Sequence, residues 1–169
     1  MNAQQDLFEK LGRELFQAET SAVVHASREA GRLLGTPLAD VLLRIATHAR
    51  ESLVVLPPSF LSRDHQRLGQ LSGRLFSTIR QVVVDRLVDR ERSYRGTLLG
   101  FHHGVDLVRL MLPLAGTRGE FEFEAWCVRW LEVREDLVEL ATAQLDWFAT
   151  HPREAVQPGT RPLSLLPLT

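Results

Sequence analysis

The chain has 169 residues, a formal net charge of −1 and 44% hydrophobic residues, which is enough for one domain with its own core. A charge this close to zero gives no electrostatic reason to expect nucleic acid or an acidic membrane as a partner. The one cysteine, Cys127, excludes an intrachain disulfide and a cysteine-cluster metal site. The polar N-terminus lacks the pattern of a signal peptide, and no apolar run approaches ~18 residues. We therefore expect a cytoplasmic protein without a membrane span.

Apolar residues recur at helical spacing in five segments, and no segment alternates as a strand does. The first helix is predicted over about 3–34. It ends at Gly35-Thr36-Pro37, where glycine suits a helix end, threonine the next N-cap and proline the first helical position. The second is predicted over 37–56, before Pro57-Pro58. The third begins at Ser59 or Ser62 and runs to about 91.

The fourth predicted helix ends near Pro113, followed by a loop over 113–119. Thr117 and Glu120 have the spacing of a capping box ahead of a fifth helix that reaches about Thr150. Prolines interrupt the chain beyond His151 and predict an extended tail. The predicted fold is thus an antiparallel all-α bundle of four to five helices over 1–150, with an extended Pro/Leu-rich tail over 151–169.

The fourth helix carries the most informative stretch, RGTLLGFHHGVDLVR. Its glycines recur every four residues, at Gly96, Gly100 and Gly104, and form one ridge on a helix. Three glycines cost a helix roughly 2–3 kcal/mol relative to alanine. The ridge therefore predicts close packing against another helix or a ligand, with this helix central in the bundle.

Several polar residues project onto faces that the apolar periodicity predicts to be buried. Glu29 falls in the middle of the inward face of the first helix and His25 on its edge, while Arg134 lies inside the apolar stripe of the fifth helix. A buried charge without a partner is costly, so Glu29 and Arg134 are the predicted ion pair. His103 borders the glycine ridge. Asp106 can pair with His102, one turn away, on a separate polar stripe.

These residues form the candidate ligand-binding set: His25, Glu29, His103, Asp106 and Arg134. A metal site would draw on His25, Glu29 and His103, because a histidine and a carboxylate one turn apart present two ligands on one side of a helix. His48 and Glu51 have similar spacing but diverge from the apolar stripe. The chain resembles ferritin-like bundles only in its number of helices, since their Glu-x-x-His order is missing. The sequence requires no cofactor.

Two functions remain open. No P-loop, dinucleotide fingerprint or complete catalytic set is present, so the first is a non-enzymatic binding and assembly protein that forms a homodimer or other homo-oligomer. Its apolar tail is predicted to dock in a groove on its own bundle, on a second copy or on a partner protein, through four leucines: Leu163, Leu165, Leu166 and Leu168. The alternative is a bundle that binds a metal or small ligand at the internal candidate set.

Overall fold

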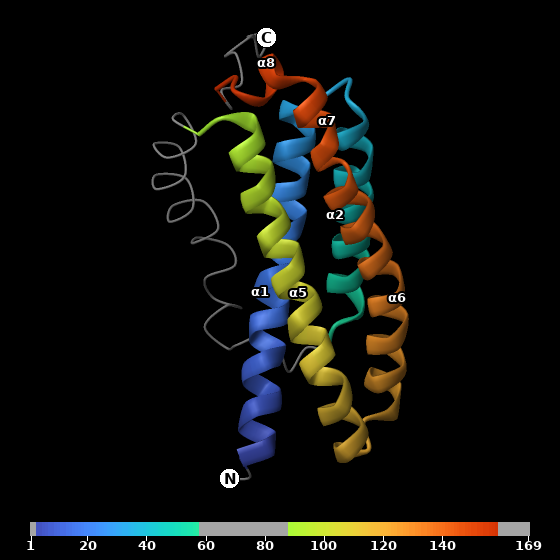
Figure 1. Ribbon diagram of the computed structural model, residues 1–169. Helices are drawn as coiled ribbons and strands as arrows, with labels where there is room; N and C mark the ends of the chain where they lie inside the picture. The colour runs from blue at the N-terminus through green and yellow to red at the C-terminus, as the bar shows by residue number, and fades with distance from the viewer. Residues whose placement is uncertain (1–2, 58–87, 159–169) are drawn as a thin grey trace, which may run out of the picture.

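A computed structural model describes residues 3–57 and 88–158. In these residues the chain forms an all-α bundle, which confirms the predicted fold class (Figure 1). The long helices are α1 (Ala3–Arg32), α2 (Pro37–Val55), α5 (Arg90–Arg118) and α6 (Phe121–Ala143), and two short helices follow, α7 (Leu145–Thr150) and α8 (Pro152–Ala155). No helix among the described residues is both long and apolar enough to span a bilayer.

The four long helices form a ring in which each neighbouring pair is antiparallel (Figure 1). α1 packs on α2 and α5, and α6 closes the ring against the same two helices. Their inward faces supply one continuous core, as the apolar periodicity predicts. Its largest fully buried apolar side chains are Tyr94, Phe101, Leu15, Leu33, Leu38, Leu42, Ile45 and Met111.

α5 is a member of this ring and is not enclosed by it. It contacts α1 and α6, while Leu99 and Leu110 on its outer face are 71% and 49% exposed. The described residues therefore do not support the predicted central position of this helix. They leave one of its long faces open.

The connection between α1 and α2 follows the prediction closely. Gly35 adopts a φ of 85°, a left-handed conformation that glycine enters without steric cost, and Pro37 begins α2. Thr36 occupies the N-cap position, but its side chain makes no capping bond. Its hydroxyl donates instead to the carbonyl oxygen of Leu33 at 2.7 Å. The threonine thus stabilises the end of α1 rather than the start of α2.

The loop predicted over 113–119 is wrong, because α5 continues through Pro113 to Arg118. Proline removes one backbone N–H and crowds the carbonyl of the residue four positions earlier. Here that residue is Arg109, which is exposed, so water can satisfy the freed carbonyl. The capping box is also wrong, since Thr117 lies inside α5 and Glu120 makes no side-chain capping bond. Gly119, at a φ of 72°, ends the helix.

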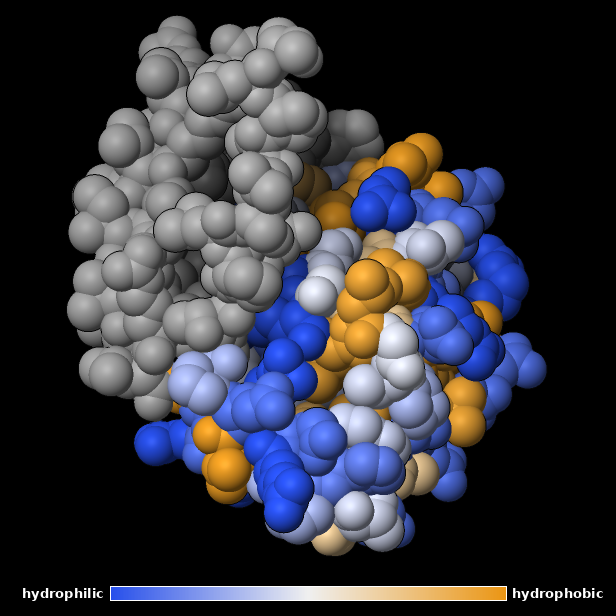
Figure 2. Space-filling model, turned by 90° about the horizontal axis from the view of Figure 1, so that it is seen from above, coloured by the Kyte–Doolittle hydropathy of each residue, from blue (hydrophilic) through white to orange (hydrophobic). Residues whose placement is uncertain are grey.

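The upper end of the bundle gathers the last described elements. The predicted fifth helix divides into α6 and α7, and residues 152–155 form the short α8 where an extended chain was predicted. Pro158 bridges Asp89, just before α5. Figure 2 shows orange apolar residues among polar ones at this end, where Leu34 and Val156 are 81% and 70% exposed. The third predicted helix up to residue 87, and the four leucines of the tail, lie outside the described residues.

Candidate functional site

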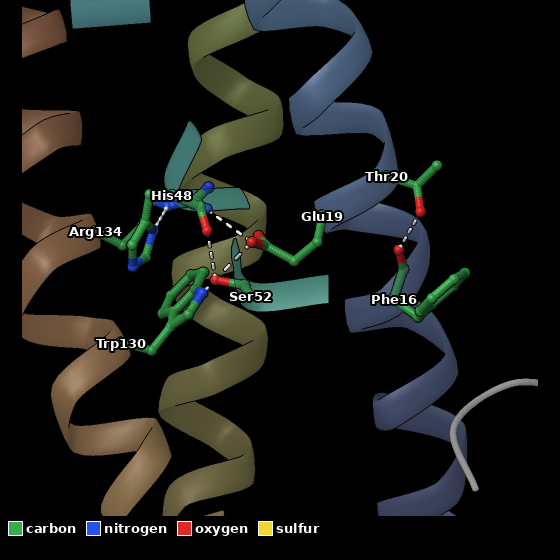
Figure 3. Close-up of polar contacts among 7 residues, drawn as sticks. All are labelled: Phe16, Glu19, Thr20, His48, Ser52, Trp130 and Arg134. Carbon is green, nitrogen blue, oxygen red and sulfur yellow. Dashed lines mark hydrogen bonds and ion pairs between the residues drawn. The ribbon is translucent and has the colours of Figure 1, made fainter. Parts of the chain in front are cut away.

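Among the described residues, one ion pair is fully buried in the bundle core, and it joins α1 to α6 (Figure 3). Nη2 of Arg134 donates to Oε2 of Glu19 at 2.7 Å, and both side chains are 1% exposed. The guanidinium also lies over the Trp130 ring, 4.7 Å from its centroid, where a cation is attracted to the π face. Arg134 is therefore buried as the sequence predicts, but its partner is Glu19.

His48 continues this cluster from the core toward the surface (Figure 3). Nε of Arg134 donates to Nδ1 of His48 at 3.1 Å, so the neutral imidazole carries its proton on Nε2. Burial and, to a smaller extent, the neighbouring Arg134 cation lower the pKa of His48 to about 4. The ring also lines a shallow hollow between α2 and α6, bounded by Arg44, Glu51, Val133 and others.

Glu19 is held in a demanding environment. Burial raises the pKa of its carboxyl above the ordinary range, although Arg134, Trp130 and Ser52 all favour the charged form. The indole of Trp130 donates to Oε2 at 3.4 Å. Ser52 lies beside the carboxylate, but its hydroxyl donates to the carbonyl oxygen of His48 at 2.8 Å, and Oε1 of Glu19 accepts no hydrogen bond. The cluster is therefore structural, and its neighbours must offset the cost of burying the charged Glu19 carboxylate.

Glu29 is buried as predicted but does not reach Arg134. Its Oε2 accepts from Ser93 at 2.9 Å and from Arg32 at 3.1 Å, and Arg32 also donates to the Ser93 hydroxyl at 2.9 Å. These contacts tie the C-terminal end of α1 to the start of α5. The predicted Glu29–Arg134 pair is therefore wrong.

His25 and His103 do come together on one surface, the groove between α1 and α5. This α1–α5 groove has a volume of about 630 Å³, within the range of ligand pockets. Its floor and walls carry small residues from both helices: Ala18, Ser21, Ala22, Ser93, Gly96, Thr97 and Gly100. The glycine ridge is thus divided, because Gly104 is buried while Gly96 and Gly100 are exposed.

Asp106 lies on a different surface, a hollow between α5 and α6 that His102 also lines. The ion pair there joins Arg109 to Glu135 at 2.9 Å, with both side chains well exposed. No hydrogen bond between His102 and Asp106 occurs in the described part of the chain. The five candidate residues therefore occupy four separate places, and only His25 and His103 share one.

Metal chemistry gains no support from the described residues, which contain no group of three or more histidine, cysteine, aspartate or glutamate side chains able to hold an ion. Cys127 is buried, and burial together with the Glu124 charge raises its thiol pKa to about 12. It is therefore an inert core thiol. Ligand binding at the candidate set stays a prediction.

Glu19 is absent from the predicted site residues, and His48 is excluded from them with Glu51. Glu19 stands four residues after Leu15 and three before Ala22, both of which face the core, so the same projection that selected Glu29 marks it as inward. His48 lies on the flank of α2 and carries no comparable signal. Compared with known proteins, the chain matches no family model, no curated protein and no solved structure.

Proposed function

We propose that this chain is a non-enzymatic binding and assembly protein that associates with a second copy of itself through the α1–α5 groove. The observation that carries the proposal is the position of Gly96 and Gly100. No described atom lies within 4 Å of the place where a Cβ would stand on either glycine. A helical glycine costs about 0.5–1 kcal/mol relative to alanine, and no contact within the described chain accounts for that cost.

A helix that approaches closely along the groove accounts for it. Glycine lets another backbone come near, and α1 faces the ridge with residues as small as Ala18 and Ser21. Leu99, beside Gly100, is 71% exposed and supplies apolar surface whose burial favours association. The groove therefore combines a floor of small residues with an apolar edge.

The buried polar cluster supports a structural rather than a catalytic role. Glu19 and Arg134 are closed to a substrate, since both are fully buried. His48 is the member that reaches the surface, and Arg134 already occupies its Nδ1. General base catalysis needs a group that is free to take a proton near neutral pH, and a histidine whose pKa lies at about 4 is a poor one.

The substitution Gly100→Leu tests the groove directly. Its Cβ would meet no described atom within 4 Å, so the described bundle tolerates it while the groove is filled. We expect wild-type protein to have the mass of a dimer by light scattering after gel filtration, and the variant that of a monomer. Gly31→Leu is the matched control, because Gly31 is also helical and open but lies outside the groove. A monomeric wild type, or a dimeric Gly100→Leu, contradicts the proposal.

The four tail leucines, Leu163, Leu165, Leu166 and Leu168, carry a separate proposal, the docking of a partner protein. A short apolar, proline-containing segment loses little conformational entropy when it binds in a groove. Deletion of the residues after Pro158 tests whether the tail acts within the chain. If the tail serves a partner, the dimer mass and the thermal stability stay unchanged. A loss of either assigns the tail to the chain's own assembly.

A further inference from the structure

We infer that the two copies pair antiparallel, about a two-fold axis at the level of Gly100, with Glu14 of each copy against the partner's Arg92. This inference rests on the self-association proposed above and specifies its register. It follows from the direction of α1 and α5, the charges at the ends of their groove and the place of the glycines between them.

The direction of the two helices is set by contacts near both ends. Nε2 of Gln4, at the start of α1, donates to Oγ1 of Thr117 at the end of α5 at 3.3 Å, and Ser93 near the start of α5 donates to Glu29 near the end of α1. The two helices are therefore antiparallel, as Figure 1 shows. Arg92 stands at the upper end of the groove and Glu14 toward its lower end.

The glycine floor lies midway between these charges. Ala22 stands between Glu19 and Glu29 on α1, as Gly100 stands between Gly104 and Ser93 on α5, and Gly104 lies next to Glu19. Ala22 and Gly100 are therefore at the same level. Arg92 precedes Gly100 by eight residues (100 − 92), and Glu14 precedes Ala22 by eight (22 − 14). At 1.5 Å per residue each charge is about 12 Å from that level, in opposite directions.

A two-fold axis through this level therefore brings opposite charges together twice. The rotation reverses the direction of the partner's groove. Arg92 and the partner's Glu14 are then at the same level, at both ends of the interface. Arg92 is exposed and makes no ion pair within the described chain. Glu14 has only a loose contact with Lys10, at 3.7 Å, one turn away. Among the described residues, neither charge therefore has a close partner that would compete with a second copy.

A parallel arrangement fails the same test. With the two grooves side by side in one direction, Arg92 lies against the partner's Arg92 and Glu14 against the partner's Glu14. Like charges across an interface weaken the wrong arrangement. Charge complementarity selects the antiparallel register, and the glycines at its centre permit close approach.

A charge swap tests the contact between the copies. We expect Arg92→Glu and Glu14→Arg each to raise the dimer dissociation constant by about tenfold or more, because each places like charges together at two symmetric contacts. The double variant carries the opposite charges in exchanged places and should return to near the wild-type value. Sedimentation velocity over a concentration series measures all four proteins, and Arg153→Glu, an exposed charge on α8, is the control.

Cysteine cross-linking tests the axis itself. Two cysteines form a disulfide only when their Cα atoms come within about 7 Å. Gly100→Cys should cross-link to the same residue of the partner under mild oxidation, because it lies near the axis. Arg92→Cys and Glu14→Cys should not cross-link to themselves, because the axis carries each residue about 24 Å along the helix from its copy. The native thiol does not interfere, since Cys127 is buried and its pKa is about 12.

These results separate the register from the proposal on which it rests. A wild-type dimer that Gly100→Leu dissociates, but in which the charge swap gives no rescue and Arg92→Cys cross-links to itself, overturns the antiparallel register and leaves the groove as the interface. A wild-type monomer overturns both. Rescue by the double variant, with cross-linking confined to Gly100→Cys, supports both.

Discussion

Gly100 and Gly104 stand one turn apart on α5 and face different surroundings. A Cβ on Gly104 would lie 3.8 Å from Oε1 of Glu19 and 3.8 Å from the Trp130 ring, whereas one on Gly100 would meet no described atom within 4 Å. Gly104 therefore adjoins a crowded polar core, and Gly100 adjoins the α1–α5 groove. Equal spacing in a sequence therefore does not give equal roles, because one turn along a helix changes which neighbour it faces.

The charged residues of the core and those of the groove also differ in burial and in pairing. In the core, Glu19 and Arg134 are fully buried and bonded to each other, so removal of either leaves the other without compensation. In the groove, Glu14 and Arg92 are accessible and their removal costs the folded chain little. The charges of the core thus affect the stability of the fold, and the charges of the groove affect association.

The largest effect is expected from Arg134→Met. It leaves the Glu19 carboxylate buried without its cation, and breaking a buried pair on one side costs about 3–5 kcal/mol. Urea unfolding measures the loss. The double variant Glu19→Leu/Arg134→Met removes both charges and should recover most of it, since apolar groups of similar size replace buried pairs at little cost. A single variant that loses less than about 1 kcal/mol contradicts the role of this pair in the core.

The same substitution should change the stability of the folded chain differently at Gly104 and at Gly100. Gly104→Leu forces a large side chain against Glu19 and Trp130, and overpacking of this kind costs about 1–3 kcal/mol. Gly100→Leu meets no described atom at its Cβ and gains helix propensity, so its folded monomer should be at least as stable as that of the wild type. Thermal unfolding of the two variants gives the comparison. Equal destabilisation by both contradicts the division of the ridge.

Apolar periodicity in the sequence encodes some features of this fold and not others. It gives the face of a residue correctly, and so Arg134 and Glu29 are both buried as expected. It does not give the level at which two helices meet, so it predicts a pair between Glu29 and Arg134 where Glu19 is the residue at the right level. Propensity also misplaced the end of α5, because Pro113 is tolerated where its carbonyl neighbour faces water.

The candidate site shows the same limit. His25 and His103 share the groove because they lie on adjoining faces of two neighbouring helices, which the sequence suggests through the glycine ridge. Asp106 is only three residues from His103 and about 60° from it around α5, but this offset is enough to place it in the hollow between α5 and α6 and not in the groove. The sequence therefore identifies polar faces more reliably than it identifies sites.

The core should also be sensitive to acid through His48. Its pKa is about 4 in the folded chain, below the ordinary 6.5, so the unfolded chain binds the additional proton between these values. Stability from this group is complete above about pH 6.5 and is lost as the pH falls toward 4. We expect a loss on the order of 1 kcal/mol, less than the full shift implies, because the ring is only half-buried and water screens it.

Denaturant unfolding at pH 7 and pH 4.5 measures this loss, with His48→Gln as the matched control. A glutamine oxygen can accept from Nε of Arg134 without titrating, so the variant should lose less stability between the two pH values. The raised pKa of Glu19 acts in the opposite sense, but it is common to both proteins and cancels from the difference. An identical pH dependence in both contradicts the assignment to His48.

A smaller effect is expected at the upper end of the bundle from Ser93→Ala. The hydroxyl donates to Glu29 and accepts from Arg32, and the loss of such a hydrogen-bonding group costs about 0.5–1.5 kcal/mol. Hydrogen exchange of the first turns of α5 should increase together with the loss of global stability. Thr97→Val is the comparison, since that hydroxyl bonds only to a backbone carbonyl within its own helix. An effect of Thr97→Val as large as that of Ser93→Ala removes the special role of the Glu29 contact.

The smallest effect is expected from Arg109→Ala, which breaks the exposed pair with Glu135 between α5 and α6. The two side chains are 60% and 41% exposed, and pairs of this kind contribute about 0–1 kcal/mol because water and salt screen them. The difference between variant and wild type should shrink further when the ionic strength is raised to about 1 M. Arg134→Met should keep its full effect under the same conditions, since salt does not reach a buried pair. A salt-independent loss above 1 kcal/mol at Arg109 shows that the α5–α6 hollow, rather than the core alone, fixes these two helices.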